Sequence, residues 1–174
     1  SSAGISRGSL KYLADTGRLD QVSRGVYTLP EVWEDEFVSI QERYKRGVFA
    51  LDTALFLHDL TDRTPHKFHM AFPYGYNTSS PKAAGILCSC KKEPYYSLGI
   101  ALVDTPAGNT VRVYNAEKTL CEILKPISHT DIQIITDAFK RYAGRKDKNI
   151  PLLSEYAHQL RVEKRLRPYL EVLL

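Results

Sequence analysis

The feature that most constrains the fold is a short amphipathic segment followed at once by a tight turn between two alternating stretches. Residues 4–14 place Leu10 and Leu13 three positions apart among polar side chains, which predicts a helix with one apolar edge. Residues 18–29 alternate on either side of Gly25, which predicts a β-hairpin because glycine can adopt the positive φ of a tight turn. A helix that leads directly into a hairpin is typical of the second half of a winged helix-turn-helix.

The polar side of this predicted helix carries the side chains that proteins use to contact DNA. Hydroxyl and basic groups hydrogen-bond to phosphates and base edges, and an arginine at a hairpin tip can reach a phosphate or a minor groove. The predicted DNA-binding residues are Ser6, Arg7, Ser9, Lys11, Tyr12 and Arg24. A helix-turn-helix needs one or two helices before the recognition helix, and the chain starts too late to contain them, so we expect this module to be partial.

The rest of the chain alternates helix-like and strand-like patterns. This predicts an α+β fold, in which the partial N-terminal winged helix-turn-helix is followed by a mixed C-terminal domain with a small sheet and C-terminal helices. The expected domains are residues 1–30, a linking helix over 31–47, and an α+β domain over 48–174. Strand-like segments occupy residues 67–72, 86–91, 96–104 and 110–114, and helical patterns occupy residues 53–57, 115–124, 131–142, 151–160 and 162–173. Asp52 is expected to cap the first of these helices, and Pro168 to interrupt the last.

Composition excludes several classes of protein. The 174 residues are enough to bury a core without a metal or a disulfide, and 43% hydrophobic and 25% charged residues are typical of a globular protein. Three cysteines, an odd number without C-x-x-C spacing, favour a reducing compartment. No apolar run approaches the ~20 residues of a membrane span, and no signal-peptide pattern is seen, so we expect a cytoplasmic protein that does not engage a membrane.

The net charge of +4 permits nucleic-acid binding without requiring it, and basic residues gather near both ends of the chain. A second basic surface is predicted near the C-terminus, from Arg145, Lys146, Lys148, Arg161, Lys164 and Arg165. Three interpretations of it stay open: nonspecific contact with DNA, contact with an acidic partner, or a solvated helix face.

Three blocks of sequence resemble the AbiEi-type antitoxins of bacterial abortive-infection, type IV toxin–antitoxin systems. They cover residues 4–27, 47–62 and 111–122. Many regulators share the helix-and-hairpin pattern, but its order with A-L-x-x-H-x-L at residues 54–60 and E-x-T-L-C at residues 117–121 is more specific. The family usually has arginine where Lys118 stands and aspartate where Glu122 stands, so both departures keep the charge.

This resemblance implies an antitoxin that also represses its own operon. Its N-terminal winged helix would bind double-stranded DNA at inverted repeats in its own promoter, and its C-terminal α+β domain would be needed for antitoxicity. The counterpart toxin is expected to be a nucleotidyltransferase-like protein, which the antitoxin opposes without forming a stable complex.

Little in the sequence indicates catalysis. Five dispersed histidines lack the spacing that places two zinc ligands on one helix face, and no glycine-rich loop is present to hold a phosphate. We therefore expect no catalytic residues, no metal and no cofactor. The alternative is an enzyme acting on nucleic acid or on the partner toxin through Asp104, Glu117 and Lys118, which resemble the acid and lysine set of metal-dependent nucleases but lack its acid-x-lysine order.

Overall fold

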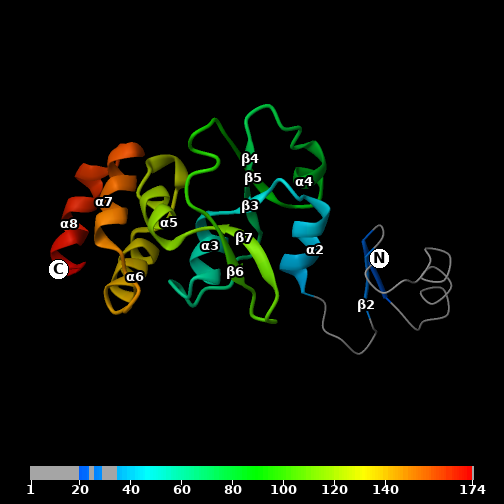
Figure 1. Cartoon of the computed structure of the whole chain (residues 1–174), viewed down its shortest axis with the longest axis horizontal. Coiled ribbons are helices and arrows are strands. Elements are labelled where there is room, and N and C mark those ends of the chain that lie inside the picture. The colour runs from blue at the N-terminus through cyan, green and yellow to red at the C-terminus, as the bar shows by residue number, and fades with distance from the viewer. Residues whose placement is uncertain (1–19, 24–25, 29–34, 174) are drawn as a thin grey trace. The chain divides into compact units, whose positions relative to one another are not determined.

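The structure, a computed structural model, describes residues 20–23, 26–28 and 35–173 (Figure 1). The chain divides into two compact units, Ser1–Lys45 and Arg46–Leu174. The predicted helix over residues 4–14 and the start of the linking helix lie outside the described residues, so the winged helix-turn-helix stays a prediction.

The first unit contains a two-stranded hairpin and a helix. β1 (Asp20–Ser23) pairs antiparallel with β2 (Val26–Thr28), which confirms the predicted hairpin strands. α2 (Glu36–Arg43) begins after Asp35, whose carboxylate accepts a hydrogen bond from the backbone N–H of Phe37 at 3.1 Å. This helix is the described part of the predicted linking helix.

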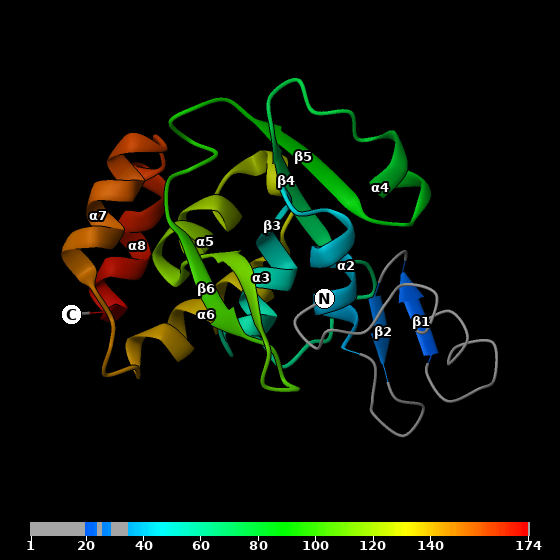
Figure 2. The ribbon, with the colours of Figure 1, turned by 45° about the vertical axis from the view of Figure 1, so that its right-hand side comes forward.

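The second unit is built on a five-stranded mixed sheet with the strand order β5-β4-β3-β7-β6 (Figure 2). The strands are β3 (Val48–Phe49), β4 (His69–Pro73), β5 (Leu87–Lys91), β6 (Ile100–Asp104) and β7 (Thr110–Tyr114). β4 pairs parallel with β5, and β6 pairs antiparallel with β7. The two pairs join through β3, which runs antiparallel to β4 and parallel to β7.

The central strand β3 has no counterpart among the predicted strands. It consists of two apolar residues, Val48 and Phe49, both fully buried. A strand that is covered on both faces shows no alternation of apolar and polar residues, and two positions are too few to show any period. The predicted α+β class with a small sheet is confirmed, and the sheet has one strand more than predicted.

Helices pack against this sheet and extend beyond it at one end of the second unit. They are α3 (Leu51–Leu57), α4 (Ser79–Ala83), α5 (Ala116–Ile123), a 3-10 turn η1 (Pro126–Ser128), α6 (Ile132–Ala143), α7 (Ile150–Gln159) and α8 (Glu163–Leu173). Figures 1 and 2 show α5 between the sheet and the outer helices α6, α7 and α8. The predicted C-terminal helices are therefore confirmed.

Three of these helices begin where a side chain caps the first turn. The side chains of Asn115, Asp131 and Asn149 accept backbone N–H groups at 2.9, 2.7 and 3.1 Å. The predicted cap at Asp52 is wrong, because Ala50 precedes α3 and Asp52 lies inside its first turn. A carboxylate there still suits the positive end of the helix dipole.

α8 runs through Pro168, so the predicted interruption is also wrong. Proline lacks the N–H that would bond to the carbonyl group of Lys164 one turn earlier. Both residues are exposed, so water can satisfy that carbonyl group and the helix continues.

The main core lies between α3, α5 and the three outer helices. Leu120, Phe139 and Leu153 are at most 1% exposed, and the ring of Phe139 stacks on Tyr169 with centroids 4.4 Å apart. Full burial of each such side chain stabilises the folded state by about 1.5–3 kcal/mol. This apolar core fixes α5 in place, and α5 also carries the buried polar residues Glu117, Lys118 and Glu122.

Candidate functional site

The predicted DNA-contacting residues all lie within residues 1–30, called here the first segment of the chain. Ser6, Arg7, Ser9, Lys11, Tyr12 and Arg24 all lie outside the described residues. The DNA interface therefore stays a prediction, and the polar arrangements below come from the second unit.

α5 carries a lysine with a fully buried side chain. Lys118 Nζ donates a hydrogen bond to the carbonyl oxygen of Tyr95 and lies 3.4 Å from the centroid of the Tyr114 ring. Burial lowers the pKa of Lys118 from 10.5 to about 7, although the nearby carboxylate of Glu122 acts in the opposite direction. The lysine thus ties the loop before β6 to the start of α5.

Glu122 connects the same helix to an outer strand of the sheet. Its Oε2 accepts a hydrogen bond from Lys91 Nζ at 2.6 Å, and its Oε1 lies 3.7 Å from Lys118 Nζ. Lys91 is the last residue of β5. Removing one member of such a buried set leaves an uncompensated charge, which is strongly destabilising.

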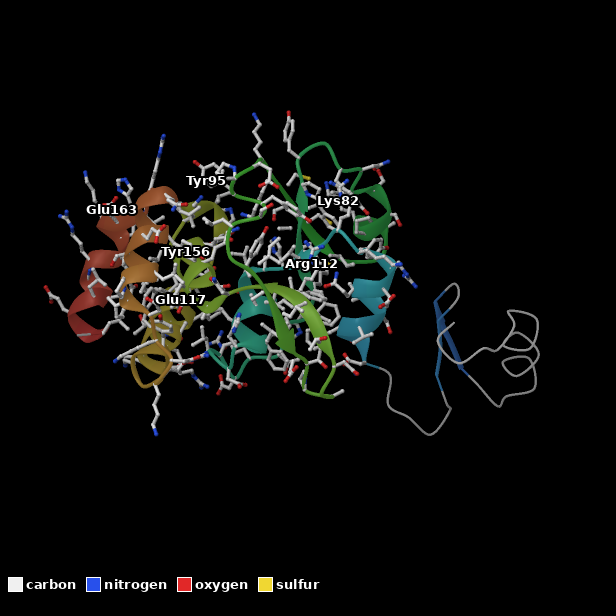
Figure 3. The ribbon with its side chains drawn as sticks, in the orientation of Figure 1. Lys82, Tyr95, Arg112, Glu117, Tyr156 and Glu163 are labelled. Carbon is white, nitrogen blue, oxygen red and sulfur yellow. The ribbon has the colours of Figure 1, made fainter. Side chains whose placement is uncertain are left out.

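Gly99 allows the loop and the helix to approach each other. Its φ of +77° is unfavourable for other residues, and a Cβ there would lie 3.1 Å from Lys118 Cβ. The backbone N–H of Asn115 donates to the carbonyl group of Gly99 at 2.7 Å. Figure 3 shows Tyr95 on the same loop, above α5.

Glu117 points away from Lys118 toward the outer helices. The hydroxyl group of Tyr142 donates to Glu117 Oε1 at 2.9 Å and accepts the backbone N–H of Asn149 at 2.7 Å. Burial raises the pKa of the Tyr142 hydroxyl, so this group remains a donor at neutral pH. Figure 3 labels Glu117 on α5, between the sheet and α7.

His58 brings two of the three resembling blocks together. Its Nε2 lies 2.8 Å from the carbonyl oxygen of Tyr114, so this nitrogen carries the proton. Burial lowers the pKa of His58, which favours the neutral ring. The blocks at residues 47–62 and 111–122 therefore meet at Tyr114 through a specific hydrogen bond.

Sequence patterns did not indicate three partners in these arrangements, Lys91, Tyr95 and Tyr114. Tyr95 contributes a backbone carbonyl group, for which no side-chain signal exists. Lys91 ends a strand and has no pattern that links it to a helix distant in the chain. Tyr114 lies in the third block that resembles the antitoxins, residues 111–122, directly before the cap residue Asn115. This position was the one sequence signal that could have pointed to a role for Tyr114.

The residues of the alternative enzyme interpretation are not brought together. Asp104 pairs with Thr110 at one end of the β6–β7 ladder, whereas Glu117 and Lys118 follow Tyr114 at the other end, about 13 Å away along the strand. Glu117 and Lys118 point to different partners, Tyr142 and Tyr95. The geometry gives this set no common place for a substrate or a metal ion.

The second basic surface divides into two parts at opposite ends of α7, a helix of 10 residues and about 15 Å. In the loop before α7, Arg145 forms two hydrogen bonds with Asp147, at 2.8 Å each, and a third with the carbonyl group of His58. Lys148 Nζ donates to the carbonyl group of Ala143 at 2.9 Å, and Lys146 is exposed. The other part, Arg161, Lys164 and Arg165, lies at the turn into α8 and is exposed.

The described part of the chain offers neither a clustered metal site nor a membrane span. No group of three or more His, Cys, Asp or Glu side chains there is placed to hold a metal ion. No helix among those residues is long and apolar enough to cross a membrane.

Comparison with known proteins bears on the first segment. Residues 1–30 match the family model described as "Transcriptional regulator, AbiEi antitoxin". The resemblance to AbiEi antitoxins is confirmed in this segment. The match includes every predicted DNA-binding residue of the segment, and it supports a regulator or antitoxin at the level of the family.

The fold also has a counterpart among solved structures. The structure titled "Crystal structure of RV2827C protein from Mycobacterium tuberculosis" is 15% identical in sequence, with a TM-score of 0.58. The similarity covers 98% of this chain and 71% of that chain, so the two proteins share a fold. No curated protein matches the sequence.

Proposed function

We propose that this chain is the antitoxin of a type IV, abortive-infection toxin–antitoxin system and that it represses its own operon by binding DNA. The observation that carries the proposal is the match of residues 1–30 to the AbiEi antitoxin and transcriptional regulator family. The hairpin strands β1 and β2 support it, because a wing in this position follows a recognition helix in the predicted module.

The DNA interface is assigned to the first segment. Arg7 and Lys11 would contact phosphates and base edges in the major groove, together with Ser6, Ser9 and Tyr12, and Arg24 would lie on the wing. The DNA partner is the promoter of its own operon, at inverted repeats. Its place of action is the cytoplasm, where that DNA lies.

The antitoxin role is assigned to the second unit. Its polar groups on α5 bond to one another and to the backbone, which supports a structural part for them rather than a catalytic one. The counterpart is a nucleotidyltransferase-like toxin, opposed without a stable complex. A reading frame for such a toxin next to this gene would support the pairing.

Binding to DNA tests the repressor part. The full chain should bind its own upstream DNA at least about tenfold more tightly than a scrambled duplex at ~150 mM salt, by fluorescence anisotropy. Arg7→Ala with Lys11→Ala should remove that preference. The matched control is Arg63→Ala with Lys140→Ala, two exposed cations of the second unit. Equal affinity of the unaltered chain for both duplexes would exclude the repressor.

Growth measurements test the antitoxin part separately. Cells that express the neighbouring toxin should grow when the full chain is supplied from an unrelated promoter. Arg7→Ala with Lys11→Ala should still restore growth, because the second unit is unchanged. Failure of the unaltered, folded chain to restore growth would exclude the antitoxin role while leaving the DNA-binding result standing.

A further inference from the structure

A pocket of about 530 Å³ lies where the parallel strands β4 and β5 begin. Its walls come from four parts of the second unit: the start of α3, the residues that lead into β4, the segment from α4 into β5, and η1 with its cap residue His129. Small-molecule sites in proteins are hollows of similar size, about 300–1,000 Å³. We call this hollow the β4–β5 pocket.

Hydrogen bonds tie the walls of the β4–β5 pocket to their neighbours. The backbone N–H of His69 in β4 donates to Oγ1 of Thr53 in α3 at 2.9 Å. The hydroxyl group of Ser128 in η1 donates to the carbonyl group of Ile123 in α5 at 3.0 Å. The pocket is therefore formed in advance of any ligand, as most small-molecule sites are.

The walls combine cations with apolar side chains. Lys67 precedes β4, and Lys82, which Figure 3 labels, lies on α4. Asp52 is the one carboxylate among the described residues that line the pocket, and partial burial raises its pKa, which weakens its negative charge. The charge balance of the walls therefore favours an anion. The large apolar lining residues are Leu51, Ile86, Leu87 and Ile127.

Two of these apolar side chains lack cover. Ile127 is 81% exposed and Leu87 is 48% exposed, although both lie beside the pocket. A ligand with an apolar body would remove part of their surface from water, which is favourable.

A buried histidine nitrogen belongs to the same walls. His69 lines the pocket, and its Nε2 is buried without a hydrogen-bond partner on any described residue. Buried polar atoms in native proteins nearly always have a partner, so an unpaired one calls for an explanation, and a ligand in the adjoining pocket supplies one. Burial lowers the pKa of His69 to about 4, so the ring is neutral at neutral pH and one of its nitrogens can donate to an anionic oxygen.

Strained backbone also lies in the walls. Leu51 has a φ of +49° and His129 a φ of +52°, in the left-handed region that favours glycine. They are two of the four non-glycine residues with positive φ in the described part of the chain. Strain of this kind is concentrated at active sites and ligand sites.

We propose that the β4–β5 pocket binds a small organic anion with an apolar body, held by its carboxylate or phosphate group. Lys67 and Lys82 bind the anionic head, because an ammonium group donates charge-assisted hydrogen bonds to such oxygens. Leu87 and Ile127 cover the apolar body. The site is separate from the DNA-binding and antitoxin roles proposed above and depends on neither.

Titration with matched probes tests the class of ligand. Octyl phosphate and octanoate share an apolar chain and differ in head group. Octanol has the chain without the charge, and inorganic phosphate has the charge without the chain. Each probe is added to the isotope-labelled full chain, below the concentration at which it forms micelles, and NMR follows the backbone amide signals of Gly85, Leu87 and Ser128.

At least one of the two anionic probes should shift those signals with a dissociation constant of about 0.1–1 mM, which suits a ligand of about a dozen non-hydrogen atoms. The tighter of the two identifies the head group. Octanol and inorganic phosphate should each bind at least about tenfold more weakly. Equal binding of octanol would show a purely apolar hollow, and equal binding of inorganic phosphate would show a simple anion site. Either result, or the absence of shifts with every probe, would overturn the proposal.

A pair of lysine variants tests the place of the anionic head. Lys67→Gln with Lys82→Gln should weaken the better probe by about tenfold or more, because both cations are lost. The control is Lys92→Gln with Lys140→Gln, which removes the same charge outside the pocket and should change the affinity by less than about twofold. All four lysines are exposed, and thermal unfolding checks that both variants fold. Equal affinities in the two variants would place the head elsewhere and overturn the proposal.

A pair of isoleucine variants tests the place of the apolar body. Ile127→Asp should weaken the same probe by about tenfold or more, since it replaces an apolar contact with a negative charge. Ile132→Asp is the control, because Ile132 is also exposed and does not line the pocket. An excess of a random DNA duplex should leave the probe bound. Displacement by the duplex, or equal loss in the two variants, would overturn the assignment of this pocket to a small molecule.

Discussion

Lys118 and Glu122 face each other across one turn of α5, with Nζ 3.7 Å from Oε1 and both side chains at most 5% exposed. Glu122 also bonds to Lys91, so one carboxylate serves two lysines. Burial outweighs this attraction for Lys118, since its pKa falls from 10.5 to about 7. The antitoxins that this chain resembles usually have arginine where Lys118 stands. An arginine would keep its charge at this position, whereas the lysine can lose it.

The depressed pKa of Lys118 predicts that stability rises with pH between about 7 and 10.5. In that window the unfolded lysine still holds a proton that the folded lysine has released, so raising the pH favours folding. Relative to Lys118→Met, the free energy of unfolding should increase by about 4 kcal/mol across the window, measured by urea unfolding. If the free energies of unfolding of the two proteins changed with pH in parallel, the pKa of Lys118 would not be lowered in the folded state.

Gly99→Ala should be more destabilising than Gly85→Ala, because only Gly99 faces a neighbour. Both glycines have positive φ, +77° and +85°, but a Cβ at Gly85 meets nothing within 4 Å. We expect a loss of about 1–2 kcal/mol at Gly85 from the backbone alone, and a further 1–3 kcal/mol or so at Gly99 from the clash with Lys118. Thermal unfolding of both variants measures the difference, and equal losses would show that α5 can shift to make room.

Tyr142→Phe should destabilise the protein by about 1–3 kcal/mol, because it removes the donor to Glu117 and the acceptor for the N–H of Asn149. A double-mutant cycle with Glu117→Gln should show a coupling energy of about 0.5–3 kcal/mol. Antitoxicity should fall only as far as the folded fraction falls. Loss of antitoxicity in a fully stable Glu117→Gln protein would instead favour the enzyme interpretation.

His69→Leu should protect the protein against acid. His69 Nε2 is buried without a hydrogen-bond partner on any described residue, and burial lowers the pKa of His69 to about 4, with Lys91 and Glu122 as its charged neighbours. Below about pH 6.5 the unfolded histidine takes up a proton and the folded one does not, so stability falls as the pH falls.

Relative to the unaltered chain, His69→Leu should gain about 2 kcal/mol between pH ~7.5 and ~5. Urea unfolding at the two values measures the gain. His66→Leu is the control, because His66 is exposed. A gain of equal size in the control would assign the effect to the loss of any histidine.

Local signals predicted much of the fold. Asn115 and Asp131 stand where a polar cap precedes an apolar period, and the helices begin there. α4 spans five residues and is too short to show a helical period. β3 is buried on both faces, so it shows no alternation of apolar and polar residues. Short elements of this kind are stabilised by their neighbours rather than by their own patterns.

The polar arrangement around α5 could be predicted only in part. The blocks at residues 47–62 and 111–122 indicated which segments matter, but the spacing of Lys118 and Glu122 on a helix is equally typical of a solvated face. Their burial depends on the loop that carries Tyr95 and on β5, both distant in the chain. Sequence periodicity reports on local geometry and carries no information about such partners.

The two-residue strand β3 has a consequence for biosynthesis. Phe49 aligns with Val113, so the middle of the sheet cannot form until a ribosome has released more than sixty further residues. Until then β3 exposes an unpaired edge that can recruit other nascent chains. Premature termination between Lys91 and Val113 should therefore produce an insoluble product rather than a shortened, working half.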